Sequence, residues 1–200
     1  MLHRPLPRLF VLVGPDHDLA LLPGLVRAGV AGFQVRDKTG SDRACLALVE
    51  CVLESVRSLG ALVVVDDRLD VALASGADGV HLGAEDLPVT AARRLAPDLV
   101  VGATCRDAAA VARAGADGAD YAGLGPLHAT TTKSGLPAPL GPAALRAAAG
   151  GLPLVAIGGL DPDRAREARA HGAHGAAVLA AVWAAADPLA AARELVAAVA

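Results

Sequence analysis

The sequence predicts a single-domain α/β fold, the (β/α)8 TIM barrel, over residues 1–200. Eight short apolar or β-branched runs recur along the chain, and alanine- and leucine-rich stretches with helical periodicity lie between them. Parallel strands need a helical crossover to return the chain, whereas antiparallel strands need only a tight turn. The alternation therefore favours a parallel sheet, and eight such units favour its closure into a barrel.

The predicted strands follow one another at short intervals, at residues 9–13, 32–35, 61–65, 79–82, 99–102, 121–124, 154–157 and 176–179. The clearest helices are predicted at 42–59, 107–114 and 162–170. Glycine-containing segments precede several strands, at 28–30, 75–79, 114–117 and 171–175. We expect glycine there to end the preceding helix in the left-handed conformation before the chain turns into the barrel.

Composition excludes several classes of protein. A hydrophobic fraction of 54% and a charged fraction of 20% in 200 residues suit a globular domain with a buried core. The net charge of -3 and the absence of a basic block with aromatics disfavour nucleic-acid binding. No apolar stretch has the length of a membrane span, so no membrane partner is predicted. Three cysteines without metal-ligand spacing favour a reducing compartment, and we expect a cytoplasmic protein.

The positive charges point to the functional residues. Lys38 and Lys133 are the only lysines, while arginine supplies the rest of the 18 basic residues, and Gln34 is the only side-chain amide. Lysine is a compact point charge with three donors, suited to phosphate or to a Schiff base. Both lysines lie in polar clusters that follow predicted strands, where barrel enzymes carry their catalytic residues.

The segment after the second strand predicts an anion site. Gln34, Arg36 and Lys38 alternate, so their side chains can project to the same side of an extended chain. An arginine fork and a lysine point charge in one pocket would bind a polyanion such as diphosphate. The alternative at this stage is a solvated loop.

Carboxylates follow the third and fourth strands, and they predict Mg2+. Mg2+ is usually held by one or two carboxylates together with water and phosphate oxygens. We expect Asp67 and Asp86 to bind the metal and Asp70 to cap the next helix.

The loop after the sixth strand is rich in hydroxyl groups, with three consecutive threonines from Thr130 to Thr132 ahead of Lys133. We expect this loop to close over an anionic substrate. Thr104 offers a further hydroxyl after the fifth strand, while the role of His128 stays open. A second anion site is predicted where loops after strands seven and eight usually bind phosphate through backbone N–H groups, at Gly158, Gly159, Leu179 and Ala180.

Taken in order, these motifs resemble those of the thiamine phosphate synthase family, also called thiamine-phosphate pyrophosphorylase. The motifs are Gln34-Val35-Arg36-Asp37-Lys38, Asp66-Asp67-Arg68, Val80-His81-Leu82-Gly83, Gly123-Leu124-Gly125-Pro126, Thr130-Thr131-Thr132-Lys133 and Ala156-Ile157-Gly158-Gly159. The resemblance implies a Mg2+-dependent transferase. It would join hydroxymethylpyrimidine diphosphate to a thiazole phosphate, giving thiamine phosphate and diphosphate.

The resemblance also implies a role for each site residue. Gln34, Arg36 and Lys38 would bind the pyrimidine diphosphate, with Asp66 beside it, and Thr104 and Lys133 would contact the diphosphate. Asp67 and Asp86 would hold Mg2+. The thiazole phosphate would lie against Thr130, Thr132, Gly159, Leu179 and Ala180. Catalysis itself would fall to Lys133, Arg36, Lys38 and Thr104, which stabilise the departing charge.

The chain departs from the family pattern at three positions. Asp66 stands where the family usually has asparagine, which adds a negative charge beside the diphosphate unless the carboxyl is protonated or metal-bound. Ala84 replaces a common glutamine, and Ala180 replaces a common serine.

Three other functions compete with this interpretation. A thiazole tautomerase of the same superfamily would share the barrel and the thiazole phosphate site, although that group tends to have histidine at the position of Pro126. A Schiff-base aldolase would use Lys133 as its nucleophile. A phosphate-binding module would keep affinity without turnover. A homo-oligomer is possible in each case, and the sequence does not choose an oligomeric state.

Overall fold

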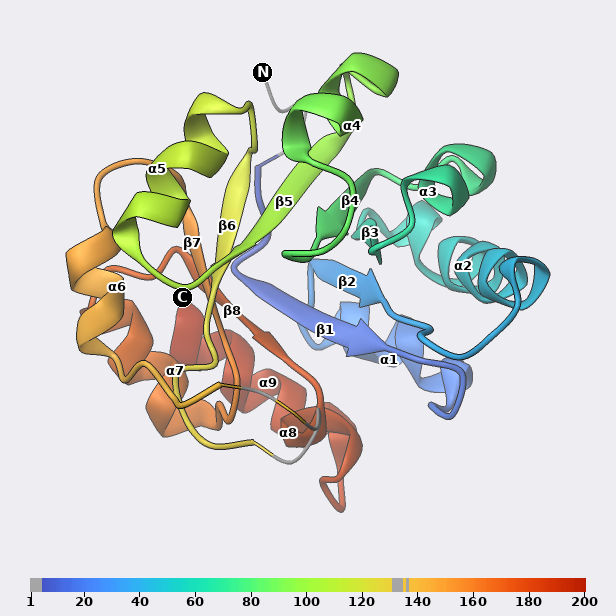
Figure 1. Cartoon of the computed structure of the whole chain (residues 1–200). Helices are drawn as coiled ribbons and strands as arrows, with labels where there is room; N and C mark the ends of the chain where they lie inside the picture. Colours follow the sequence, from blue (N-terminus) through green and yellow to red (C-terminus); the bar gives the residue numbers. More distant parts are fainter. Residues whose placement is uncertain (1–4, 131–134, 136) are drawn as a thin grey trace.

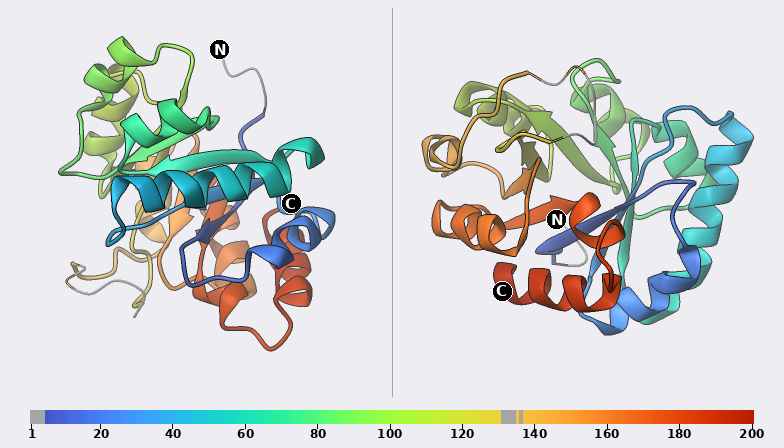
Figure 2. Two further views of the ribbon diagram at one scale, coloured as in Figure 1. Left: turned by 90° about the vertical axis from the view of Figure 1, so that its right-hand side faces the viewer. Right: turned by 90° about the horizontal axis from the view of Figure 1, so that it is seen from below.

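The computed structural model describes residues 5–130, 135 and 137–200. Eight parallel strands pair in chain order, and β1 pairs with β8 to close the barrel. Figure 1 shows the strands at the centre with the helices outside them, and Figure 2 shows the same arrangement from two further sides. The predicted (β/α)8 barrel is therefore confirmed.

The strands are β1 (Leu9–Val13), β2 (Gly32–Val35), β3 (Leu62–Asp66), β4 (Gly79–Leu82), β5 (Val100–Cys105), β6 (Tyr121–Leu124), β7 (Leu154–Ile157) and β8 (Gly175–Val178). Five have the predicted bounds. The third and eighth are displaced by one residue, and the fifth extends to Cys105. The extension makes Thr104 part of a strand rather than of a loop.

The helices are α1 (Leu22–Arg27), α2 (Asp42–Val56), α3 (Leu69–Ser75), α4 (Val89–Leu95), α5 (Ala108–Ala116), α6 (Ala143–Ala148), α7 (Pro162–Ala170), α8 (Ala180–Trp183) and α9 (Pro188–Val199). Short 3-10 turns lie at Leu19–Leu21 and Arg57–Leu59. Side chains that accept from backbone N–H groups begin several helices, as Ser41, Asp107, Asp161 and Asp187 do. In the part of the chain that is described, no helix is both long enough and apolar enough to cross a bilayer.

Two expectations about helix ends were wrong. Gly76 ends α3 with a positive φ of 67°, as predicted, but Gly115 lies inside α5, and Gly118, with a φ of 97°, makes the left-handed turn there. Asp70 does not cap α3, because Arg68 occupies that position and binds the Asp70 carboxylate in the first helical turn. The glycine and aspartate patterns identified the turns correctly and missed the residue by two or three positions.

The barrel has two apolar cores, one on each side of the sheet. The larger lies between strands and helices, and the smaller fills the barrel with Leu6, Phe10, Leu12, Leu62, Val64, Val100, Tyr121, Val155 and Ala177. Successive residues of a strand face opposite sides, so every second residue faces the interior. Along β3 the interior residues are Leu62, Val64 and then Asp66, which changes from apolar to acidic at the carboxyl end. The same alternation places polar side chains at the mouth.

Candidate active site

A cavity of about 330 Å³ opens at the carboxyl ends of the strands. Its lining includes ten of the predicted site residues: Gln34, Arg36, Lys38, Asp66, Asp67, Thr104, Thr130, Gly159, Leu179 and Ala180. Asp86 does not line the cavity, but its carboxylate accepts from the backbone of Gly83, which does. Thr132 and Lys133 lie outside the described residues. The structure thus brings residues from β2, β3, β5, β7 and β8 to one mouth, as the strand-end positions predicted.

Two cation–carboxylate pairs join β2 to β3 at this mouth. The Lys38 Nζ atom lies 2.5 Å from the Asp67 Oδ2 atom, and the Arg36 Nε atom lies 3.8 Å from the Asp66 Oδ2 atom. The Lys38 side chain is 43% exposed, whereas that of Asp66 is 8% exposed. The segment contributes Gln34, Arg36 and Lys38 to the cavity wall.

Asp66 is a buried acid held by an amide. The Gln34 Nε2 atom donates to the Asp66 Oδ1 atom. Burial, aided by the neighbouring Asp67 charge, raises the pKa of Asp66 to about 7, although the hydrogen bond from Gln34 and the nearby Arg36 oppose this shift. A carboxyl with this pKa is protonated in a large fraction of molecules near neutral pH. The extra negative charge expected from an aspartate at this position is therefore present in only part of the molecules near neutral pH.

Asp67 and Asp86 are hydrogen-bonded to each other beside Lys38. Burial alone would raise the pKa of Asp67, but hydrogen bonds from Lys38 and Asp86 outweigh it and hold the pKa below its usual value. Burial and the hydrogen bond to Asp67 raise the pKa of Asp86. The Asp86 Oδ2 atom also accepts from the Gly83 N atom at 2.6 Å. Asp67 adopts a positive φ of 66°, a strained conformation for a residue with a side chain.

The opposite wall consists of backbone at the ends of β7 and β8. Gly158 and Gly159 have positive φ values of 96° and 64°. A Cβ atom on Gly159 would lie 2.4 Å from the Ala129 O atom, so the chain can pass there only without a side chain. Leu179 stands at the start of α8, and Leu179 and Ala180 line the cavity. This wall can therefore approach a ligand with its main chain.

Sequence reasoning assigned no role to three polar lining residues, Arg106, His81 and Tyr121. The Arg106 guanidinium donates to the Gly125 O atom at 3.2 Å and the Ala138 O atom at 2.8 Å. His81 and Tyr121 face the interior from β4 and β6. The signal that could have found them is the two-residue alternation of their strands, which puts a histidine and a tyrosine on the inner face.

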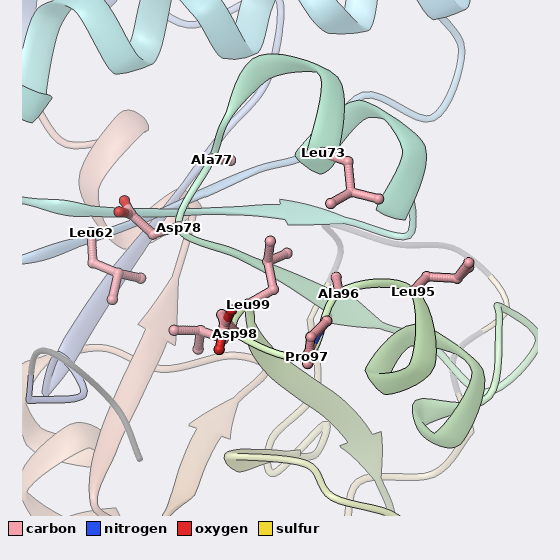
Figure 3. Close-up of a pocket in the computed structure, with 10 residues that line it drawn as sticks. Leu62, Leu73, Ala77, Asp78, Leu95, Ala96, Pro97, Asp98 and Leu99 are labelled. Carbon is pink, nitrogen blue, oxygen red and sulfur yellow. The ribbon is translucent and has the colours of Figure 1, made fainter.

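A second, larger cavity of about 490 Å³ lies at the other end of the barrel. Figure 3 shows its lining, which combines leucines of α3 and α4 with Asp78 and Asp98. Among the described residues, no group of three or more histidine, cysteine or acidic side chains is arranged to hold a metal ion. Cationic and carboxylate side chains line the smaller cavity at the carboxyl ends of the strands, whereas no cationic side chain in the described part of the chain lines the larger one.

The chain is similar to known proteins over nearly its whole length. The family model for thiamine monophosphate synthase matches residues 10–182. The thiamine biosynthesis bifunctional protein ThiM/ThiE of Symbiobacterium thermophilum is 49% identical over 191 residues, which are 94% of this chain and 40% of that protein. The thiamine-phosphate synthase of Chlorobium luteolum is 43% identical over 96% of this chain and 92% of its own length.

A solved structure agrees with these relatives. The thiamine phosphate pyrophosphorylase from Pyrococcus furiosus superposes with a TM-score of 0.87 at 34% identity, covering 96% of this chain and 95% of that one. Similarity in sequence, in fold and in the order of the strand-end motifs therefore points the same way. The chain belongs to the thiamine monophosphate synthase family and is an enzyme of thiamine phosphate synthesis.

Proposed function

We propose that the cavity at the carboxyl end joins hydroxymethylpyrimidine diphosphate to a thiazole phosphate and releases diphosphate, with Mg2+ bound at Asp67 and Asp86. The observation that carries the proposal is the row of opposite charges between β2 and β3. Lys38 and Arg36 are held at the mouth by Asp67 and Asp66, while their charges stay close to the cavity. Such a site suits a leaving group whose negative charge grows during the reaction.

The donor set at Asp67 and Asp86 fits Mg2+. A hydrogen bond between the two carboxyl groups raises the pKa of Asp86, since their oxygens would repel each other if both groups were ionised. A divalent cation would relieve the same repulsion, and two carboxylates leave coordination positions for water and phosphate oxygens. Bound there, Mg2+ would neutralise charge on the diphosphate.

The side chains of the chain itself would orient the pyrimidine diphosphate. Arg36 and Lys38 would contact its phosphate oxygens, and Thr104 would reach them from β5. Gln34 is 4% exposed and lies two residues before Arg36, deeper in the cavity. Its amide would face the pyrimidine ring. Lys133 would approach the diphosphate from the loop after β6.

The thiazole phosphate would bind the opposite wall. Thr130 and the main chain at Gly159, Leu179 and Ala180 line it, and Thr132 would join them. A backbone site tolerates the alanine at position 180, because main-chain donors do not depend on the side chain. The two substrates would then face each other across the cavity.

The reaction needs one bond to break and one to form. The bond between the pyrimidine methylene carbon and the diphosphate oxygen breaks, and its electrons leave with the diphosphate. The electron-rich pyrimidine ring stabilises the resulting cation, and the lone pair of the thiazole nitrogen forms the new C–N bond. Arg36, Lys38 and Lys133 would act mainly on the departing charge, which is largest in the transition state.

The test is an assay of the purified protein with both substrates over a series of Mg2+ concentrations. We expect thiamine phosphate and diphosphate in equal amounts, with no product in EDTA. Asp86→Asn keeps the shape of the side chain but removes its charge, and it should raise the Mg2+ concentration needed for half-maximal rate. Glu85→Gln is the matched control, because Glu85 is exposed and lies outside the cavity lining.

Each competing outcome identifies a different function. Conversion of a thiazole isomer without release of diphosphate would indicate the tautomerase. Irreversible labelling by borohydride in the presence of a keto acid would indicate a Schiff base at a lysine. Binding of thiazole phosphate without turnover would indicate a binding module. Failure of all product formation at saturating Mg2+ would overturn the proposal.

A further inference from the structure

Three polar side chains from the neighbouring strands β4, β5 and β6 form a hydrogen-bonded chain at the inner end of the cavity. The His81 Nδ1 atom lies 3.1 Å from the Tyr121 hydroxyl oxygen, and the His81 Nε2 atom lies 3.0 Å from the Thr104 Oγ1 atom. Tyr121 is 1% exposed and His81 is 8% exposed, while Thr104 is open to the cavity. The chain thus runs from the closed barrel interior to the surface that the substrate would touch.

Two glycines make room for this arrangement. A Cβ atom on Gly102 would lie 2.2 Å from the Tyr121 Cζ atom, and a Cβ atom on Gly123 would lie 2.9 Å from the His81 Cε1 atom. The Tyr121 ring also stacks on Phe10 with ring centroids 5.7 Å apart. His81 and Tyr121 are therefore held by packing on several sides, which leaves their rings little freedom to choose other partners.

The burial of Tyr121 decides the direction of the hydrogen bonds. Within the part of the chain that the structure describes, His81 is the only hydrogen-bond partner of the Tyr121 hydroxyl. If that hydroxyl accepted from Nδ1, its own proton would be buried without an acceptor, which is costly. The Tyr121 hydroxyl therefore donates to Nδ1.

The hydrogen bond from Tyr121 also fixes the direction of the hydrogen bond between His81 and Thr104. A ring nitrogen that accepts a hydrogen bond carries no proton, so an imidazole that accepts at Nδ1 is neutral and carries a single proton. With Nδ1 accepting, that proton is on Nε2, which donates to the Thr104 Oγ1 atom. The Thr104 hydroxyl proton then has to point elsewhere, and the cavity is the direction in which Thr104 is exposed.

We propose that His81 and Tyr121 are positioning residues that fix the Thr104 hydroxyl as a hydrogen-bond donor toward the diphosphate of the substrate. The inference rests on the proposed function, in which Thr104 contacts the diphosphate. The opposite direction would turn the Thr104 lone pairs toward an anion and repel it. The hydrogen-bonded chain from Tyr121 through His81 to Thr104 would thus turn a donor toward the polyanion without adding a positive charge to the cavity wall.

The first experiment is a double-mutant cycle between Tyr121 and Thr104. Tyr121→Phe keeps the ring over Gly102 and removes only the hydroxyl. We expect its kcat to fall ~10-fold, because the His81 tautomer is no longer fixed, with the KM for thiazole phosphate within about twofold. In a Thr104→Ala background the same change should alter kcat less than about twofold, because no hydroxyl remains to be oriented.

Thr104→Ser is the matched background, since it keeps the hydroxyl, and Tyr121→Phe should lower kcat there as it does in the wild type. A merely structural role of Tyr121 would lower kcat by the same factor in all three backgrounds. That result, or full activity of Tyr121→Phe in the wild-type background, would overturn the proposal.

The second experiment needs no substrate, so its outcome is independent of the proposed function. Nitrogen-15 NMR of the histidine rings should show His81 as the neutral tautomer protonated at Nε2, assigned among the six histidines by loss of its signals in His81→Asn. In Tyr121→Phe the signal should move toward a mixture of tautomers. A wild-type His81 ring protonated at Nδ1 would overturn the proposed hydrogen-bond direction. If the ring is protonated at Nε2 but no thiamine phosphate is formed, only the proposed function is overturned.

Discussion

Both ends of the barrel carry aspartates, but those at the amino end bind the backbone of neighbouring strands, whereas those at the carboxyl end line a cavity. At the amino end, the Asp78 Oδ2 atom accepts from the Val63 N atom at 2.8 Å, and the Asp120 Oδ2 atom accepts from the Val101 N atom at 2.8 Å. Each therefore ties the start of one strand to its neighbour. At the carboxyl end, Asp66 and Asp67 pair with the cationic side chains of Arg36 and Lys38 at a cavity.

The cavities differ in the same way. The amino-end cavity is the larger, yet apolar residues dominate its lining (Figure 3), whereas the carboxyl-end cavity also carries cations, carboxylates and glycine backbone. Cavity volume therefore does not identify the site in this protein. What identifies it is the presence of charged groups whose pKa values burial and neighbours have moved.

The largest effect on turnover is expected from Lys133→Ala, a change at the carboxyl end of the barrel. Loss of this charge should lower kcat by ~100- to 1000-fold, because the negative charge on the leaving diphosphate is greatest in the transition state. Steady-state kinetics with both substrates measures the change, and the melting temperature should stay within about 2 °C of wild type. Full activity of the variant would remove Lys133 from the site and leave Arg36 and Lys38 as its cations.

The next effect concerns the pH dependence of folding stability in Asp66→Asn. The pKa of Asp66 is about 7 in the folded protein and lies near 3.8 when unperturbed, so between these values the folded state binds more protons than the unfolded state. The free energy of unfolding should therefore fall as pH rises through this range. Each pKa unit is worth about 1.4 kcal/mol, which allows a contribution of up to ~4 kcal/mol.

Asp66→Asn removes this titration, so its stability should fall less than that of wild type between about pH 4 and pH 8. Urea unfolding of the ligand-free proteins at several pH values measures the difference. Parallel curves for the two proteins would mean that Asp66 is ionised in the folded state and that its charge does reach the cavity.

The smallest effect is expected from Asp78→Ala at the amino end. Loss of the acceptor leaves the Val63 N–H group without its partner, at a cost of ~1–3 kcal/mol in the free energy of unfolding. Turnover should remain that of wild type, because Asp78 lies at the far end of the barrel from the reaction. A large loss of kcat in a folded Asp78→Ala protein would contradict the view that the amino end contributes to stability and the carboxyl end to catalysis.

Much of this arrangement could be predicted from the sequence, because it depends on short-range patterns. Apolar runs and helical periodicity located the strands, and the end of each strand located Gln34, Arg36, Lys38 and Asp67. The polar positions follow from the rule that strand ends of a parallel barrel meet at one mouth. Their roles remain proposals, and the segment that holds Thr132 and Lys133 lies outside the described residues.

The remainder depends on side-chain packing across paired strands, which a linear pattern does not contain. His81, Thr104 and Tyr121 meet because β4, β5 and β6 pair side by side and because Gly102 and Gly123 leave space inside the barrel. The state of Asp66 depends likewise on how deeply it is buried, and burial at a strand end is set by the loops around it. These are properties of packing rather than of spacing.

The apolar plug inside the barrel also acts as an insulator. Phe10, Leu12, Val64 and Val155 fill the interior below the polar residues, so water is excluded from one side of the site. Charges on such a floor interact more strongly than charges surrounded by water, and their field is directed outward through the mouth. Side chains that touch no substrate would thus increase the attraction that Arg36 and Lys38 exert on an approaching polyanion.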